Sequence, residues 1–160
     1  MNTNDQNHRA ILKSIAHRVM LERGLLPDFS TEALAELGRL QVPITIDSKT
    51  VRDMRNLLWA SIDNDDSRDL DQLTVAEATP AGQVKILVAI ADVDSSIKNG
   101  SAIDQHARNN TTSVYTAAEM FPMLPEKVST DITSLNFNED RLSIVVEMLV
   151  GADGSLEDSK

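Results

Sequence analysis

Residues 61–73, SIDNDDSRDLDQL, gather five carboxylates into the nine positions from Asp63 to Asp71, with Arg68 as the one cation among them. Two carboxylates about 5 Å apart repel by roughly 3 kcal/mol at an effective dielectric constant near 20. A solvated loop can spread this charge outward, whereas a loop that points its carboxylates at one spot needs a cation there. The residues alone leave two alternatives open: a solvated acidic turn and a site for a divalent metal ion.

The spacing of the loop excludes one common metal site. A calcium-binding EF-hand loop that began at Asp63 would need glycine at its sixth position and glutamate at its twelfth, but Arg68 and Thr74 stand there. Magnesium takes few oxygen ligands from a protein and completes its shell with water or substrate phosphates. Asp63, Asp69 and Asp71 suit that ion, or Mn²⁺, if they lie at the end of a strand.

The segments before the loop predict a helical N-terminal region over residues 1–50. Apolar residues at helical spacing predict a helix from residue 8 to Gly24, and Ser30 is placed to cap a second helix. The segment 48–58, SKTVRDMRNLL, predicts a third and shorter helix. The basic side chains of the first helix either meet RNA or form its solvated face.

After Leu58 the hydrophobic pattern changes from a helical to a strand period. Ser101, with Asp104 three residues later, predicts a capped helix between strands. Strands are predicted over residues 73–78, 84–93 and 141–150, the first two forming a hairpin through a turn at 80–83. The expected fold class is therefore α+β: helices first, then an antiparallel or mixed sheet over residues 51–160. Few residues follow the turn at 151–155, so we expect an incomplete sheet and a truncated domain.

Composition limits the classes of function. A hydrophobic fraction of 41% and a charged fraction of 25% are those of a folded protein. A net charge of −10 argues against simple electrostatic adhesion to nucleic acid, although bound metal ions invert the local sign. The absence of cysteine excludes disulfides and thiolate metal sites, and no apolar run reaches membrane-spanning length. These features indicate a cytoplasmic protein without a membrane partner.

Several blocks resemble the catalytic (RNB) domain of the ribonuclease II and R family. IDNDDSRDLDQL is similar to the family signature I-D-G-x-D-A-x-D-x-D-D. VAIADV, GSAIDQHARNNTTSVY, FPMLPEKVS and SLNFNEDRLSIVVEM follow in the family's order, so the resemblance covers roughly residues 52–157. The first 50 residues look like a helical replacement for the cold-shock domains that many members carry.

The resemblance implies a hydrolytic 3′→5′ exoribonuclease that uses Mg²⁺ to degrade single-stranded RNA, not DNA, to nucleoside 5′-monophosphates. It implies that Asp63, Asp69 and Asp71 are catalytic and metal-binding residues, with Asp71 most directly tied to cleavage. Gln72 stands where the family has another aspartate. Its amide oxygen can coordinate a metal but brings no charge, so a second ion would bind more weakly. The change indicates either altered metal dependence or a damaged active site.

The resemblance also implies a role in RNA binding for residues near the acidic loop and beyond it. Tyr115 matches an aromatic residue that stacks on an RNA base, although it could instead be a half-buried tyrosine with a bonded hydroxyl. We assign Arg68 to RNA binding as well. Asp92 is either a polar anchor near the metal site or a strand-end cap.

The alternative to an enzyme is a non-catalytic RNA-binding or regulatory remnant of the RNB fold. The resemblance implies a catalytic domain that extends well beyond these 160 residues. We therefore expect this piece alone to lack processive activity.

Overall fold

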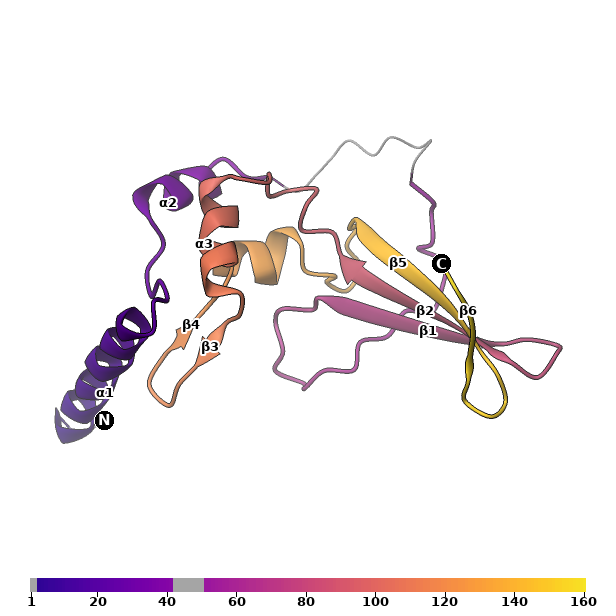
Figure 1. Ribbon diagram of the computed structural model, residues 1–160, viewed down its shortest axis with the longest axis horizontal. Helices are drawn as coiled ribbons and strands as arrows, with labels where there is room; N and C mark the ends of the chain where they lie inside the picture. Colours follow the sequence, from indigo (N-terminus) through magenta and orange to yellow (C-terminus); the bar gives the residue numbers. More distant parts are fainter. Residues whose placement is uncertain (1–2, 42–50) are drawn as a thin grey trace. The chain divides into compact units, whose positions relative to one another are not determined.

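The computed structural model describes residues 3–41 and 51–160 and divides the chain into two compact units (Figure 1). One unit contains Met1–Leu40 and Ile97–Lys127, and the other contains Gln41–Ser96 and Val128–Lys160. The domain boundary placed at residue 50 stays a prediction, since the compact units follow a different division. Among the described residues, no helix has the length and apolar character needed to cross a membrane.

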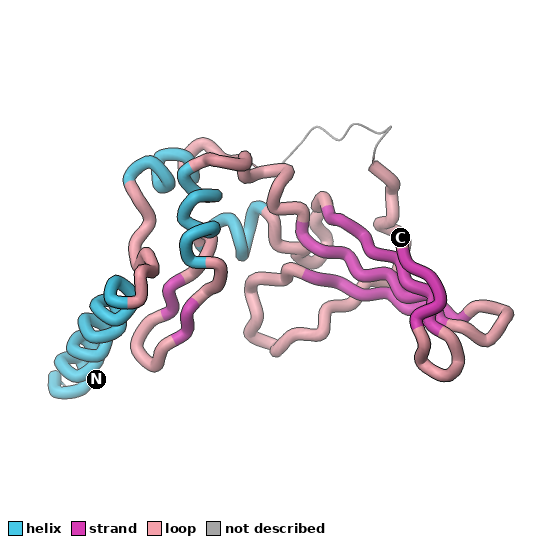
Figure 2. Tube along the Cα trace, viewed as in Figure 1, coloured by secondary structure: helices cyan, strands magenta, loops and turns pink. Residues whose placement is uncertain are grey.

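The second unit is built on a four-stranded antiparallel sheet in the order β1-β2-β5-β6 (Figure 2). The hairpin of the first two strands is confirmed, and β6 returns beside β5 after the turn at 151–155. Helices and an antiparallel sheet together confirm the α+β fold class. The strands span Gln72–Ala78 (β1), Val84–Ala91 (β2), Ser143–Val150 (β5) and Leu156–Ser159 (β6).

The apolar side chains of the sheet divide between a buried and an exposed side. Val75 of β1 lies directly opposite Leu87 of β2, and both are buried. Ile90 and Ile144 are also direct cross-strand partners, yet they are 46% and 59% exposed. Because successive residues of a strand point to opposite faces, Leu87 and Ile90 lie on opposite sides of the sheet. The core of this unit therefore forms on the side of Leu87, and also contains Val128, Ile132 and Leu135, the first two in the one-turn π-helix Val128–Ile132 (η1).

The first unit consists of three helices and a short hairpin. Ser30 and Ser101 cap α2 and α3 as predicted, since each hydroxyl accepts a hydrogen bond from a backbone N–H three residues later. The carboxylate of Glu36 accepts a hydrogen bond of 3.1 Å from the backbone N–H of Ile103, which places an anion at the positive end of α3. The elements are α1 (Thr3–Glu22), α2 (Thr31–Leu37), α3 (Ala102–Asn110), β3 (Val114–Tyr115) and β4 (Met120–Phe121).

The third helix predicted over residues 48–58 is wrong for the part that the structure describes. Residues 51–58 form an extended segment and a turn, while 48–50 lie outside the described residues. Asp53 Oδ1 accepts a hydrogen bond of 3.1 Å from the backbone N–H of Arg55 and another of 2.9 Å from its Nε. Such local side-chain bonds satisfy the backbone outside a helix and compete with helix formation.

His106 is a buried polar group in the first unit. Its Nε2 lies 3.1 Å from Asn110 Nδ2, and its ring centroid lies 4.0 Å from that of Phe29. Burial lowers the pKa of His106 below its ordinary value of 6.5, and a hydrogen bond with the backbone of Pro122 partly opposes this shift. The folded chain therefore holds His106 neutral more strongly than the unfolded chain does.

The burial of His106 predicts a pH-dependent stability. A pKa that is lower in the folded state means that the stabilisation is fully present above the unfolded pKa of about 6.5 and is lost as the pH falls below it. We expect the Tm of His106→Gln to fall less than that of the unaltered chain between neutral and mildly acidic pH. Thermal melts across this range test it, with His8→Gln at an exposed site as the matched control. Equal slopes in both variants would contradict the prediction.

Candidate functional site

The register of the sheet brings three acidic loops to one of its ends. Gln72 at the start of β1 pairs with Ile90 near the end of β2, which pairs with Ile144 near the start of β5. The loops that leave these strand ends, 61–71, 92–96 and 136–142, therefore share that end (Figure 1). Their nine carboxylates are Asp63, Asp65, Asp66, Asp69, Asp71, Asp92, Asp94, Glu139 and Asp140.

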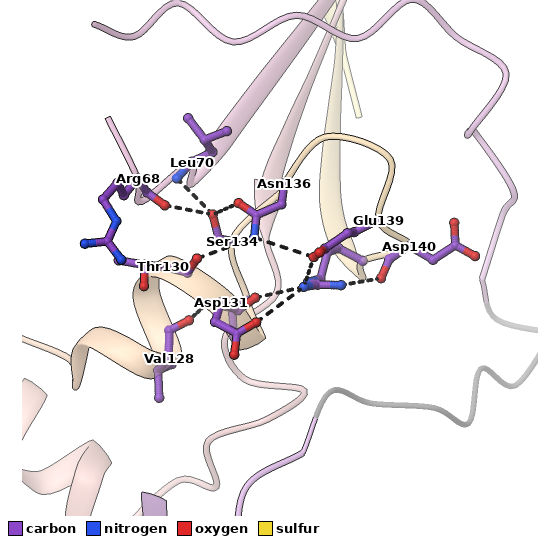
Figure 3. Close-up of polar contacts among 11 residues, drawn as sticks. Arg68, Leu70, Val128, Thr130, Asp131, Ser134, Asn136, Glu139 and Asp140 are labelled. Carbon is purple, nitrogen blue, oxygen red and sulfur yellow. Dashed lines mark hydrogen bonds and ion pairs between the residues drawn. The ribbon is translucent and has the colours of Figure 1, made fainter. Parts of the chain in front are cut away.

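The last residues of the acidic loop are fixed to the body of this unit. The backbone N–H of Leu70 donates to Ser134 Oγ at 3.1 Å (Figure 3). Its carbonyl accepts from the backbone N–H of Leu135 at 2.8 Å. The carbonyl of Asp71 accepts from the backbone N–H of Ala91 at 2.9 Å. Bonds across the fold thus fix the backbone on either side of the Asp71 amide.

The first residues of the acidic loop are held by a local turn, in which the backbone N–H of Ser67 donates to the carbonyl of Asn64 at 3.0 Å. The side chains of Asp63, Asp69 and Asp71 are all exposed, and so is Ile62, which follows the strand bridge at Ala60 by two residues. The structure therefore places the three predicted aspartates on one loop. Asp69 and Asp71 lie on its anchored part, residues 69–71, and Asp63 lies on the part held by the local turn.

The fit of this loop to a metal ion has two parts. Carboxylate oxygens are the donors that Mg²⁺ prefers, so the side-chain chemistry fits. Within residues 3–41 and 51–160, however, no group of three or more histidine, aspartate or glutamate side chains lies close enough to hold an ion. The structure does not bring Asp63, Asp69 and Asp71 together, and the metal site stays a prediction.

Gln72 lies at the start of β1 rather than in the loop. It is exposed and stands in the cross-strand row of Ile90 and Ile144. Its neighbour Asp71 precedes the strand. The amide of Gln72 is thus available at the surface, beside the anchored end of the acidic loop.

Two arginines counter the carboxylates of the loop 136–142. The side chain of Arg141 is only 9% exposed; it pairs with Glu139 and donates to the backbone carbonyl of Asp131 at 2.9 Å (Figure 3). Arg55 Nη1 donates to Asp140 Oδ2 at 2.7 Å. The same guanidinium, through hydrogen bonds, lowers the pKa of Asp53 to about 2. These ion pairs attach the segment before β5 at two points.

Asp92 caps the turn that follows β2. Its Oδ1 accepts from the backbone N–H of Ser95 at 3.2 Å, and its carbonyl accepts from Ser95 Oγ at 2.7 Å. Its own N–H donates to the carbonyl of Leu142 at 3.1 Å. This geometry supports the interpretation of Asp92 as a strand-end cap.

Tyr115 and Arg68 belong to different units. Tyr115 lies on β3 in the first unit and is 70% exposed, so the alternative of a half-buried tyrosine is wrong. Arg68 lies in the acidic loop of the second unit, with an exposed side chain and a carbonyl 3.3 Å from Ser134 Oγ. An exposed aromatic face is what base stacking requires, but RNA contact by either residue stays a prediction.

Two residues of this end of the sheet escaped the sequence analysis. Ser134 is 1% exposed and stands among the polar contacts in Figure 3, and the side chain of Arg141 is 9% exposed. A serine among Thr133, Leu135 and other apolar or hydroxyl side chains gives no local signal of its partner, which lies 64 residues away. The only available signal was the position of Ser134 inside the SLNFNED block.

Comparisons with known proteins identify the family. The sequence model of the RNB domain matches residues 51–160. Ribonuclease R of Escherichia coli (strain K12) is 41% identical over 104 residues, which cover 65% of this chain and 13% of that protein. Ribonuclease R of Thermotoga maritima is 36% identical over 130 residues, which cover 79% of this chain and 18% of that protein.

Solved structures agree with this match. A structure of Mycoplasma genitalium RNase R in complex with double-stranded RNA superposes with a TM-score of 0.79 and 28% identity, over 89% of this chain and 25% of that one. A second structure of that protein, with ribose-methylated single-stranded RNA, gives a TM-score of 0.72. The chain belongs to the RNB domain family, as its resemblance predicted, and it spans about a quarter or less of the length of these relatives.

Proposed function

We propose that this chain supplies the metal-binding acidic loop of a hydrolytic 3′→5′ exoribonuclease that degrades single-stranded RNA to nucleoside 5′-monophosphates in the cytoplasm. The observation that carries the proposal is the RNB match over residues 51–160, which includes the acidic loop. Relatives named Ribonuclease R and RNase R structures that contain RNA support it. Because the chain spans about a quarter or less of the length of those proteins, the proposal concerns the acidic loop and not a complete enzyme.

In this proposal Asp63, Asp69 and Asp71 hold Mg²⁺ or Mn²⁺, and Gln72 contributes an uncharged oxygen. A divalent ion at such a site lowers the pKa of bound water and neutralises charge at the scissile phosphate. Asp69 and Asp71 are on the anchored part of the loop, whereas Asp63 is on the part held by a local turn. Metal binding would therefore require the three carboxylates, which the structure does not bring together, to converge on one ion.

A second candidate is a non-catalytic RNA-binding or regulatory protein that keeps the RNB fold. Gln72 in place of an aspartate favours it, and so does the lack of a gathered donor group among the described residues. The two functions differ in whether the acidic loop binds a divalent ion, so metal binding separates them.

Metal binding by the loop predicts a cation-dependent Tm. A ligand that binds only the folded state stabilises it by about 2.7 kcal/mol at roughly 100 times its Kd. We expect Mg²⁺ or Mn²⁺ to raise the Tm of the unaltered chain, and Asp71→Asn to abolish the rise. The matched control is Asp158→Asn in β6, which removes an equal charge at the other end of the sheet. We expect its Tm to rise with the cations as that of the unaltered chain does. A Tm that ignores both cations would favour the non-catalytic candidate.

Restoring the family's aspartate predicts tighter metal binding. Gln72→Asp adds a charged oxygen beside Asp71, so we expect the Mg²⁺ midpoint of thermal stabilisation to fall about five- to tenfold, on the order of 1 kcal/mol of Coulomb attraction. Asn64→Asp adds the same charge on the locally held part of the loop and serves as the control. If both variants shift the midpoint equally, the effect is one of net charge, and position 72 has no special part in metal binding.

The limited span of the chain predicts that it is inactive by itself. We expect no release of mononucleotides when the 160-residue chain is incubated with end-labelled single-stranded RNA and Mg²⁺. Escherichia coli Ribonuclease R in the same chromatographic assay provides the positive control. Release by the chain that disappears in Asp71→Asn would show that these residues contain a complete site.

A further inference from the structure

Ser134 stands at the centre of the contacts that fix the acidic loop. Its side chain is 1% exposed, and its Oγ accepts a hydrogen bond from the backbone N–H of Leu70 at 3.1 Å. The same oxygen lies 2.9 Å from Asn136 Oδ1 and 3.3 Å from the carbonyl of Arg68 (Figure 3). A hydroxyl has one proton, so it donates to one of these two acceptors at a time, and Asn136 offers the shorter bond.

The bond from Leu70 is part of a clamp on a single residue of the loop. Ser134 satisfies the N–H of Leu70, and the backbone N–H of Leu135 satisfies its carbonyl at 2.8 Å. Leu70 lies between Asp69 and Asp71, so the clamp fixes the backbone from which both carboxylates extend. Neither partner contacts the carboxylates through these bonds, which leaves their oxygens available.

Of the two groups that bond to Leu70 in this clamp, the hydroxyl of Ser134 belongs to a side chain and the N–H of Leu135 to the backbone. A substitution can therefore remove the hydroxyl alone. The N–H of Leu70 is partly buried, and without this acceptor it lacks a protein partner, so the backbone moves to recover one. In this clamp the movement would displace Asp69 and Asp71 together. A carboxylate misplaced by a fraction of an ångström coordinates a metal ion less well.

We propose that Ser134 is a positioning residue that sets the placement of Asp69 and Asp71 for metal binding. This inference rests on the proposed function of the acidic loop, and it adds a residue outside the acidic signature to the site. Ser134 acts through the backbone of Leu70 and touches neither the metal nor the RNA.

The test compares Ser134→Ala with Thr133→Val. Thr133 is the neighbouring residue and is also buried, and its hydroxyl donates to the carbonyl of Val128 at 3.0 Å, so each variant removes one buried hydroxyl. Two measurements are made on the 160-residue chain: amide hydrogen exchange without metal, and the Mg²⁺ and Mn²⁺ midpoints of thermal stabilisation. We expect Ser134→Ala to speed exchange at Leu70 about tenfold and to raise the metal midpoint about five- to tenfold, with Thr133→Val changing neither.

The two readouts separate the possible failures. Unchanged exchange at Leu70 in Ser134→Ala would overturn the clamp, whatever the metal does. Faster exchange with an unchanged metal midpoint would make Ser134 a structural residue and also overturn the inference. If the unaltered chain shows no response to either cation, the proposed function itself fails, and faster exchange in Ser134→Ala would then mark a purely structural anchor.

Discussion

Mutual repulsion among carboxylates limits how the loops can be held at the end of the sheet where β1 begins. Nine of them lie in three loops that the antiparallel register brings to the same end. Arg55 and Arg141 form ion pairs with Asp140 and Glu139, which ties the segment before β5 to its surroundings. Exposed pairs of this kind contribute little on their own, whereas the buried guanidinium of Arg141 depends on its partners, because an unpaired buried charge is costly.

The acidic loop 61–71 is held in a different way. Its anchored part is bound through backbone groups by neutral partners: the hydroxyl of Ser134 and the amides of Leu135 and Ala91. A cationic anchor would hold the loop by occupying the carboxylate oxygens. A neutral anchor that binds the backbone holds the chain and leaves those oxygens free to bind a divalent ion. One end of the sheet therefore contains both a segment held by ion pairs and a loop held through its backbone, whose carboxylates take no part in those backbone bonds.

The sequence could predict those structural features that depend on residues a few positions apart along the chain. The caps at Ser30 and Ser101 and the β1–β2 hairpin follow from side-chain chemistry and alternation within a few positions, and the structure contains all three. The helix predicted over 48–58 is wrong for its described part because Asp53 Oδ1 accepts bonds from the backbone N–H and Nε of Arg55, which satisfy this backbone outside a helix.

The placement of the acidic loop could not be predicted in the same way. Its anchor joins Leu70 to Ser134 across 64 residues, and no local pattern marks either residue as the partner of the other. The resemblance supplied the types of the site residues and their order along the chain, but it carried no information on which backbone groups fix them. Distances among Asp63, Asp69 and Asp71 depend on those long-range bonds and on any ion that draws the carboxylates together.

Gln72 shows how the same repulsion bears on the choice of residue beside the loop. An aspartate at this position would add a charge next to Asp71 and in the exposed row of Ile90 and Ile144, where water screens it only in part. The added like charge would repel that of Asp71, and a bound cation would offset the repulsion. The amide avoids this cost in the metal-free chain and keeps one oxygen for coordination. Under the proposed metal binding, the stability of the metal-free chain and its metal affinity would place opposite demands on position 72, and glutamine favours the first.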